Sequence, residues 1–252
     1  MSTLTLTSRG ALGDWLAERN ASLRVVAALA YAVVTVSLSR LSVLLVALGL
    51  SLGFGLGIGL AWRLLARRVL ALEGFMLVLV GFLPFTVPGE TVATLAGLTI
   101  SAEGLHRAAE ILLTANTVML AGLALLGTLD PVRLGYALGR LRVPDKLVHL
   151  FLFTVRYVGI LQDEYGRLRR AMRARAFRPG NNRHSWRAFG WLFGMLLVRG
   201  LERSRRVHAA MKCRGFEGRL HLINPPVWQP ADTTAAAGIG GVLLALLLLE
   251  HL

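Results

Sequence analysis

The sequence predicts an all-α integral membrane protein with about five to six transmembrane helices and long cytoplasmic amphipathic helices. Three observations predict this class. Hydrophobic residues make up 55% of the 252 positions and mean hydropathy is +0.59, whereas the apolar share of a soluble domain is roughly 45–50%. The apolar residues gather in runs long enough to cross a bilayer. Most basic residues gather in one segment between the fourth run and the last.

The first half of the chain predicts three crossings. Residues 25–62 form an apolar run that is interrupted only near Ser39–Ser42. A bilayer core of about 30 Å takes roughly 20 apolar residues per helix, so this run predicts two helices joined by a tight turn. Residues 69–85 predict the third crossing, which Pro84 and Pro88 bring to an end.

Two further crossings complete the expected membrane part. A loop rich in Pro and Gly, without Lys or Arg, is expected at 84–103. Residues 104–127 and 233–250 predict the fourth and fifth crossings. The expected domains are a four-helix membrane domain at 1–127, a cytoplasmic or inner-face domain with two basic helices at 128–222 and a C-terminal transmembrane helix at 223–252.

The central segment is neither soluble nor fully membrane-like. Residues 145–165 are long enough to span but carry Lys146 and Arg156, and the apolar stretch 188–198 is too short for a perpendicular crossing. If only the first crossed, the basic helix ends that follow each stretch would lie on opposite sides of the membrane. We therefore expect both stretches to enter the membrane partly or to tilt along its inner face.

Charge predicts the orientation. The net charge is +14, and residues 133–219 hold 20 of the 28 Lys and Arg against five carboxylates. This local concentration argues against a general basic coat for nucleic acid. The positive-inside rule makes the N-terminus and the 133–219 segment cytoplasmic, in what we expect to be a bacterial inner membrane. Only Lys146 and Lys212 are lysine, so the segment offers guanidinium groups suited to carboxylates and phosphates.

A short basic sequence occurs twice. AMRARAF at 171–177 returns as AMKCRGF at 210–216. Apolar spacing predicts an amphipathic helix before each copy, so each lies at a helix C-terminus. Gly215 is the residue type that ends a helix with positive φ, whereas the first helix is expected to run on to the Arg178–Gly180 stretch. The small residues beside each arginine let the backbone of a partner approach, so the guanidinium can pair with a carboxylate of that partner.

Attraction of basic helices to anionic lipid explains the many arginines, and the residues alone favour it about as much as contact with a protein partner. Lipid attraction does not, however, explain a repeated residue order. The motif residues are Ala174, Arg175, Ala176, Cys213, Arg214 and Gly215, flanked by Met172, Arg173, Phe177, Met211, Lys212 and Phe216.

The sequence offers no convincing catalytic pattern. It has no G-x-x-x-x-G-K-[ST] loop for ATP and no H-E-x-x-H. The spacing G-x-S-x-G occurs at 49–53, but there it lies inside an apolar helical run rather than at the strand-to-helix turn that exposes a nucleophile. We expect no enzyme activity, no cofactor and no resident metal in this chain. Glu103, His106 and Glu110 share one helix face and suit a divalent cation. They lie at the outer start of the fourth crossing, where a solvated helix entry needs no ligand, and we favour this second explanation.

The segment 128–177 resembles a known family. Its L-x-x-L-R-V-P turn, R-Y segment, acidic pair and Arg-rich helix ending in Ala-Arg-small resemble the transmembrane (T) component of energy-coupling factor (ECF) transporters, in the CbiQ/NikQ branch. In that family two Ala-Arg-Gly motifs end two coupling helices, and each docks on one of two ATP-binding-cassette ATPases. The resemblance assigns this role to Ala174-Arg175-Ala176 and Cys213-Arg214-Gly215, where Ala176 and Cys213 depart from the family pattern.

The resemblance implies a scaffold that links two ATPase (A) subunits, which bind the ATP, to a membrane substrate-binding (S) subunit. A CbiM/NikM type for cobalt or nickel, with or without a small accessory membrane subunit, is the expected S subunit, and a vitamin-type transporter is an alternative. The Gly-rich run 49–59 suits packing against that partner or inside the same bundle. The alternative from another class is a self-contained carrier whose basic helices only bind lipid.

Overall fold

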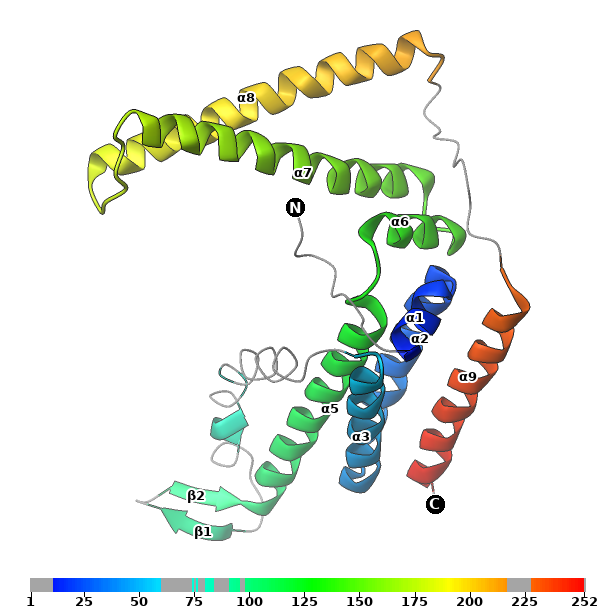
Figure 1. The fold of residues 1–252 in the computed structure, drawn as a ribbon. Coiled ribbons are helices and arrows are strands. Elements are labelled where there is room, and N and C mark those ends of the chain that lie inside the picture. The colour runs from blue at the N-terminus through cyan, green and yellow to red at the C-terminus, as the bar shows by residue number, and fades with distance from the viewer. Residues whose placement is uncertain are drawn as a thin grey trace. The chain divides into compact units, whose positions relative to one another are not determined.

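The structure, a computed structural model, describes residues 11–59, 74, 76, 80–83, 91–95, 98–216 and 228–251. In these residues the protein is helical apart from one short β-hairpin, which confirms the all-α class (Figure 1). The chain divides into two compact units, Leu138–Pro225 and Ser2–Ala137 with Pro226–Leu252. We call the first the arm unit and the second the bundle unit. The predicted three-part division at 127 and 222 stays a prediction.

The bundle unit is built from helices α1, α2, α3, α5 and α9. Their bounds are Ala11–Glu18, Ala21–Val36, Leu41–Gly57, Ala102–Leu126 and Pro230–His251. Asn20 starts α2 by accepting a hydrogen bond from the Ser22 amide, and Ser101 starts α5 by accepting from the Gly104 amide. The predicted turn between the first two crossings is confirmed, although the helix break falls at residues 37–40 rather than at Ser39–Ser42.

Two of these helices, α5 and α9, are long and apolar enough to cross a membrane, and α1 with α2 forms a third candidate bent by 112°. The 17-residue α3 is apolar but shorter. The predicted third crossing at 69–85 lies largely outside the described residues. Apolar helices of this kind make the chain a membrane protein.

The expected loop at 84–103 is wrong in its second half. Thr91–Leu95 (β1) and Leu98–Ser101 (β2) pair as an antiparallel hairpin, and α5 follows directly. The stretch is rich in Thr, Val and Ile, which favour strands, and this local preference outweighs the neighbouring Pro and Gly.

Carboxylates of α9 fix its direction in the bundle. Asp232, at the start of α9, accepts a hydrogen bond of 3.1 Å from the Asn20 amide at the start of α2. Glu250, at the other end, accepts from the Ser39 amide at 3.0 Å and from the Arg40 amide that precedes α3. Helix α9 therefore runs parallel to α2 and satisfies amides at the N-termini of two helices.

Helix α5 runs the opposite way. The buried Arg24 of α2 donates from Nε to the carbonyl of Leu125, at the end of α5, over 2.9 Å. The same end of the bundle also holds Arg133, which donates to the carbonyl of Ala17 at 3.0 Å. The packing in between uses small side chains, among them the fully buried Ala47 and Ala124.

The Gly-rich run at 49–59 is divided between two environments. A Cβ on Gly57 would lie 2.7 Å from the Leu12 side chain, so this glycine allows α1 to approach α3. Gly49 and Gly53 have open space at the same position. Packing inside the bundle therefore accounts for the end of the run, and the role of its beginning remains a prediction.

The arm unit consists of two long helices and the end of α6 (Pro131–Arg140). Asp145–Ala174 (α7) and Arg183–Cys213 (α8) have 30 and 31 residues. They form a helical hairpin whose members cross (Figure 1). The stretches 145–165 and 188–198 are parts of these continuous helices, and neither helix is apolar enough to be a candidate span.

Candidate functional site

Both copies of the repeated sequence close a long helix in the same way. Helix α7 ends at Ala174 and α8 ends at Cys213. The Phe177 amide donates to the Met172 carbonyl at 3.1 Å, and the Phe216 amide donates to the Met211 carbonyl at 3.1 Å. One residue earlier, Ala176 donates to Arg173 and Gly215 donates to Lys212, both over 3.0 Å. This pair of hydrogen bonds is the Schellman motif of helix C-termini.

The expected end of the first helix is wrong. Ala176 adopts φ 58°, and Gly215 adopts φ 76°, so both occupy the left-handed region that this motif requires. The helix therefore ends before Ala176 instead of running on to Arg178–Gly180. The hydrogen bonds of the motif offset the left-handed strain of an alanine, which is roughly 1–2 kcal/mol.

The motif also explains part of the repeated order. Met172 and Phe177 hold the two positions that make the hydrophobic contact of a Schellman motif, as do Met211 and Phe216. These four side chains are half-buried, while the residues between them are exposed in both copies. Helix capping therefore accounts for Met, Phe and the small residues, but it does not require the arginine.

Arg175 and Arg214 are the cap residues of α7 and α8, and both are exposed. Within the described residues, neither guanidinium makes a hydrogen bond or ion pair. A cation at a helix C-terminus is favoured by the helix dipole. The structure thus presents two guanidinium groups, unpaired among the described residues, at two helix ends that share the same capping hydrogen bonds.

The two ends differ in their surroundings. Phe177 packs edge-on against Phe189, with ring centroids 5.8 Å apart, so α8 supports the first motif. Arg175 borders a hollow of about 1110 Å³ that is also lined by Arg187, Trp191 and Arg199. The second motif borders a smaller hollow of about 670 Å³ between α7 and α8, which Phe216 lines.

Sequence reasoning missed the contacts where the helices cross. A Cβ on Gly200 of α8 would lie 3.5 Å from the Leu161 side chain of α7. Glu164 of α7 forms ion pairs with Arg167 and with Arg199 of α8. Hydrogen bonds from these two arginines, Arg167 first, hold the pKa of Glu164 below its usual range. The acidic residue in an Arg-rich helix was the signal that could have revealed this pair.

The crossing separates the two motifs. At about 1.5 Å per residue, the stretches from Glu164 to Arg175 and from Arg199 to Arg214 run about 16 and about 22 Å in opposing directions. The two cap arginines therefore lie at opposite ends of the hairpin, up to about 39 Å apart measured along the helices.

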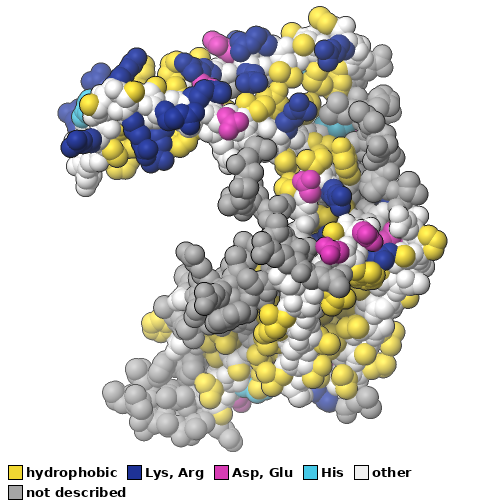
Figure 2. All heavy atoms as spheres, in the orientation of Figure 1, with side chains coloured by type: hydrophobic (Ala, Val, Ile, Leu, Met, Phe, Trp, Pro, Cys, Tyr) yellow, Lys and Arg dark blue, Asp and Glu magenta, His cyan; other side chains and the backbone are white. Residues whose placement is uncertain are grey.

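The surface of the arm is basic and partly apolar. Figure 2 shows Lys and Arg side chains gathered over α7 and α8. Helix α8 also exposes large apolar side chains, namely Trp186, Trp191, Phe193 and Leu197. Exposed apolar area beside arginines is typical of a surface that contacts lipid or another membrane protein.

The possible divalent-cation site on α5 is not formed. Among the described residues, which include Glu103, His106 and Glu110, no three His, Cys, Asp or Glu side chains lie close enough to hold a metal ion.

Comparison with known proteins places most of the chain in one family. The chain matches the family model CbiQ, cobalt transport protein, over residues 14–223. It is 28% identical over 144 residues to the cobalt transport protein CbiQ of Rhodobacter capsulatus, which covers 57% of either chain. It is 27% identical over 96 residues to an uncharacterised protein of Methanocaldococcus jannaschii, covering 38% of this chain and 35% of the relative. The matched regions thus span about half or less of these relatives.

Proposed function

Because the chain belongs to the CbiQ family of cobalt transport proteins, we propose that it is the transmembrane coupling subunit of an ECF-type importer. In this function it connects two ATPase subunits to a separate membrane subunit that binds the substrate. The family is one of transport proteins, so the chain is a transporter component rather than an enzyme. ATP is bound by the partners.

The observation that carries the proposal is the pair of identical helix ends. Two unpaired arginines, Arg175 and Arg214, stand at Schellman caps of the same geometry at opposite ends of one hairpin. A pair of identical partners, here the two ATPases, would meet the same small, basic tip twice. The small residues beside each arginine let a partner backbone approach, and the guanidinium suits a carboxylate. Lipid attraction alone does not require this equivalence.

The mechanism we propose is mechanical. ATP binding closes the ATPase pair, and closure draws the two tips toward each other. Since α7 and α8 touch at Gly200 and Leu161, this movement turns the helices about their crossing point. The exposed apolar side of α8 then passes the movement to the substrate-binding subunit, as in a shear or hinge transition of packed helices.

Substrate and location follow from the family and from charge. Cobalt is the proposed substrate, with nickel or a vitamin as alternatives, and a CbiM/NikM-type subunit, with or without a small accessory membrane subunit, is the proposed binding partner. Arg19, Arg24 and Arg133 lie at one end of the bundle unit, where α5 ends and α9 begins. By the positive-inside rule, this end and both motifs are cytoplasmic in an inner membrane.

A self-contained carrier with lipid-bound basic helices is the second candidate. It is favoured by the apolar side chains that α8 exposes, such as Trp186 and Leu197, next to its arginines.

Purification and reconstitution separate the two functions. The chain is expressed together with its candidate ATPases and substrate-binding subunit, and then alone, and each preparation is placed in liposomes. The scaffold function predicts that the tagged chain retains the ATPases and the second membrane protein, and that only the full complex takes up radiolabelled cobalt when ATP is supplied to the ATPase side. Uptake by the chain alone would contradict it.

A further inference from the structure

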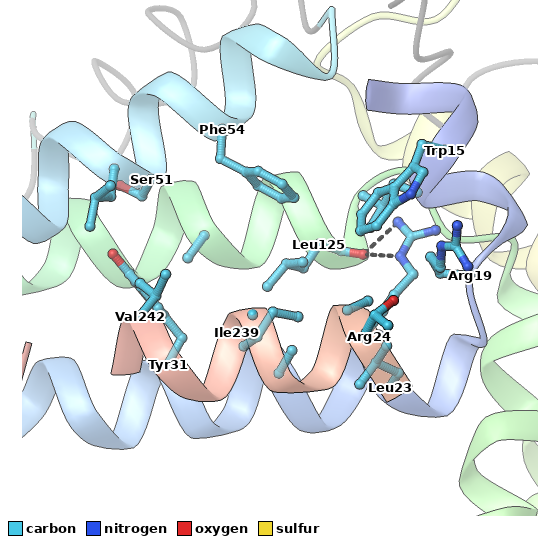
Figure 3. Close-up of a pocket in the computed structure, with 17 residues that line it drawn as sticks. Trp15, Arg19, Leu23, Arg24, Tyr31, Ser51, Phe54, Leu125, Ile239 and Val242 are labelled. Atoms are coloured by element: carbon cyan, nitrogen blue, oxygen red, sulfur yellow. Dashed lines mark hydrogen bonds between the residues drawn. The ribbon is translucent and has the colours of Figure 1, made fainter. Parts of the chain in front are cut away.

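The bundle unit contains a groove that the proposed coupling function does not use. It has a volume of about 450 Å³ and lies between α2, α3, α5 and α9, with α1 at one end (Figure 3). This volume is in the range of pockets that hold small ligands. On α2 the groove extends from Leu23 to Tyr31, about 12 Å along the helix.

One end of the groove is cationic. Trp15, Arg19 and Arg24 gather there, whereas Tyr31, Ser51 and Val242 lie at the other end (Figure 3). The guanidinium of Arg24 is occupied by the Leu125 carbonyl. Arg19 stands over the Trp15 ring at 4.6 Å, and its buried Nε has no hydrogen-bond partner among the described residues. No Asp or Glu is among the described lining residues. This end therefore has an unused donor and a positive charge.

The rest of the groove is apolar and open at one side. Phe54, Leu125 and Ile239 line its middle. Leu50 of α3 and Val242 of α9 are 45% and 42% exposed. Since α5 and α9 are candidate membrane spans, the open side faces a medium of lipid chains. A hydrocarbon chain can enter sideways from this medium.

We propose that this groove binds one anionic phospholipid, with an acyl chain along α9 and the headgroup phosphate at Arg19. The occupant must fill an apolar groove and bring an anion to one end. Free phosphate would leave the apolar part unfilled, and a neutral lipid would leave Arg19 without its anion. Tryptophan and arginine at the cationic end suit the depth of lipid headgroups.

Gly238 offers a direct test. It lines the groove, and a Cβ on it would meet no atom within 4 Å, so Gly238→Leu fills the groove without displacing a neighbour at its base. Gly240 also has open space but does not line the groove, so Gly240→Leu is the matched control. Arg19→Gln removes the cation while leaving the apolar groove intact.

The complete chain is purified, stripped of lipid in detergent, and exposed to micelles containing phosphatidylglycerol or phosphatidylcholine. Native mass spectrometry then counts the phospholipid retained per chain. We expect one phosphatidylglycerol in preference to phosphatidylcholine, a loss of about tenfold in affinity in Gly238→Leu and none in Gly240→Leu. Arg19→Gln should weaken phosphatidylglycerol binding by about fivefold, the effect of one basic residue at a lipid surface.

Three results would overturn the proposal. The first is equal retention by Gly238→Leu and Gly240→Leu. The second is displacement of the lipid by inorganic phosphate alone, which would make the site one for a free anion. The third is a photo-crosslink from position 238 to residues 69–85, which would make that segment of the chain the occupant.

Discussion

Replacing Ala176 by glycine should strengthen the end of α7. Ala176 has φ 58° and donates to the Arg173 carbonyl, so an L-residue is held in a conformation that costs roughly 1–2 kcal/mol. Glycine relieves this strain but gains roughly 0.5–1 kcal/mol of unfolded-chain entropy. The net stabilisation of the last turn is about 0.5–1 kcal/mol, which slows exchange of the Phe177 amide about two- to fivefold.

Hydrogen–deuterium exchange of the complete chain in nanodiscs measures this effect, because exchange of a capping amide reports local opening of the helix end. Ala174→Gly is the matched control. It lies inside the helix, where glycine costs about 0.8–1.0 kcal/mol relative to alanine, so exchange of the same amide should become faster. Faster exchange in Ala176→Gly as well would refute the Schellman geometry assigned to this copy.

Three further predictions concern contacts inside the arm unit and inside the bundle unit. Gly200→Leu should separate α7 from α8, because a Cβ at this position would already lie 3.5 Å from the Leu161 side chain. Spin labels on Cys213 and on an introduced Ala174→Cys should report a changed distance between the two labels. Gly194→Leu, where a Cβ meets open space, should leave that distance unchanged. Arg167 and Arg199 lower the pKa of Glu164. The ion pair of Glu164 with Arg199 therefore stabilises the crossing fully above the ordinary pKa of 4.5 and is lost as the pH falls through the lowered pKa. The distance between the two spin labels should change only in acid, and Glu164→Gln should remove this pH dependence. Asp232→Ala leaves the buried Asn20 amide without its acceptor, at a cost of about 1–3 kcal/mol, so the thermal midpoint in detergent should fall. Asp130→Ala, which removes only an exposed N-cap hydrogen bond at the start of α6, should lower the midpoint by less.

Much of the fold could be predicted because its signals are local. Apolar runs gave the positions of α2, α3, α5 and α9, and the basic amphipathic stripes gave two long helices that end near the repeated sequences. Gly215 marked the end of α8 correctly, since glycine adopts positive φ without strain. The same rule failed at Ala176, where the hydrogen bonds and the Met172–Phe177 spacing impose the conformation on a residue that does not favour it.

Contacts between distant segments could not be predicted. Nothing in the sequence near Asp232 or Glu250 indicates that their partners are amides at the starts of α2 and α3. The crossing at Gly200 likewise depends on which faces of α7 and α8 meet, and periodicity gives the faces but not their pairing. The docking role of Arg175 and Arg214 remains a prediction, because it concerns proteins other than this chain.

The most direct test of the coupling function compares the two cap arginines with other arginines of the same helices. Arg175→Ala, Arg214→Ala and the double variant are co-expressed with the ATPases and the substrate-binding subunit, beside Arg169→Ala and Arg205→Ala, which are exposed on α7 and α8 away from the motifs. ATPase retention and ATP-driven cobalt uptake are then measured. We expect each cap variant to weaken both, the double variant to abolish them, and the controls to change little. Equal and mild effects of all four single changes would mean that the arginines act only as lipid-facing charge, and would contradict the account.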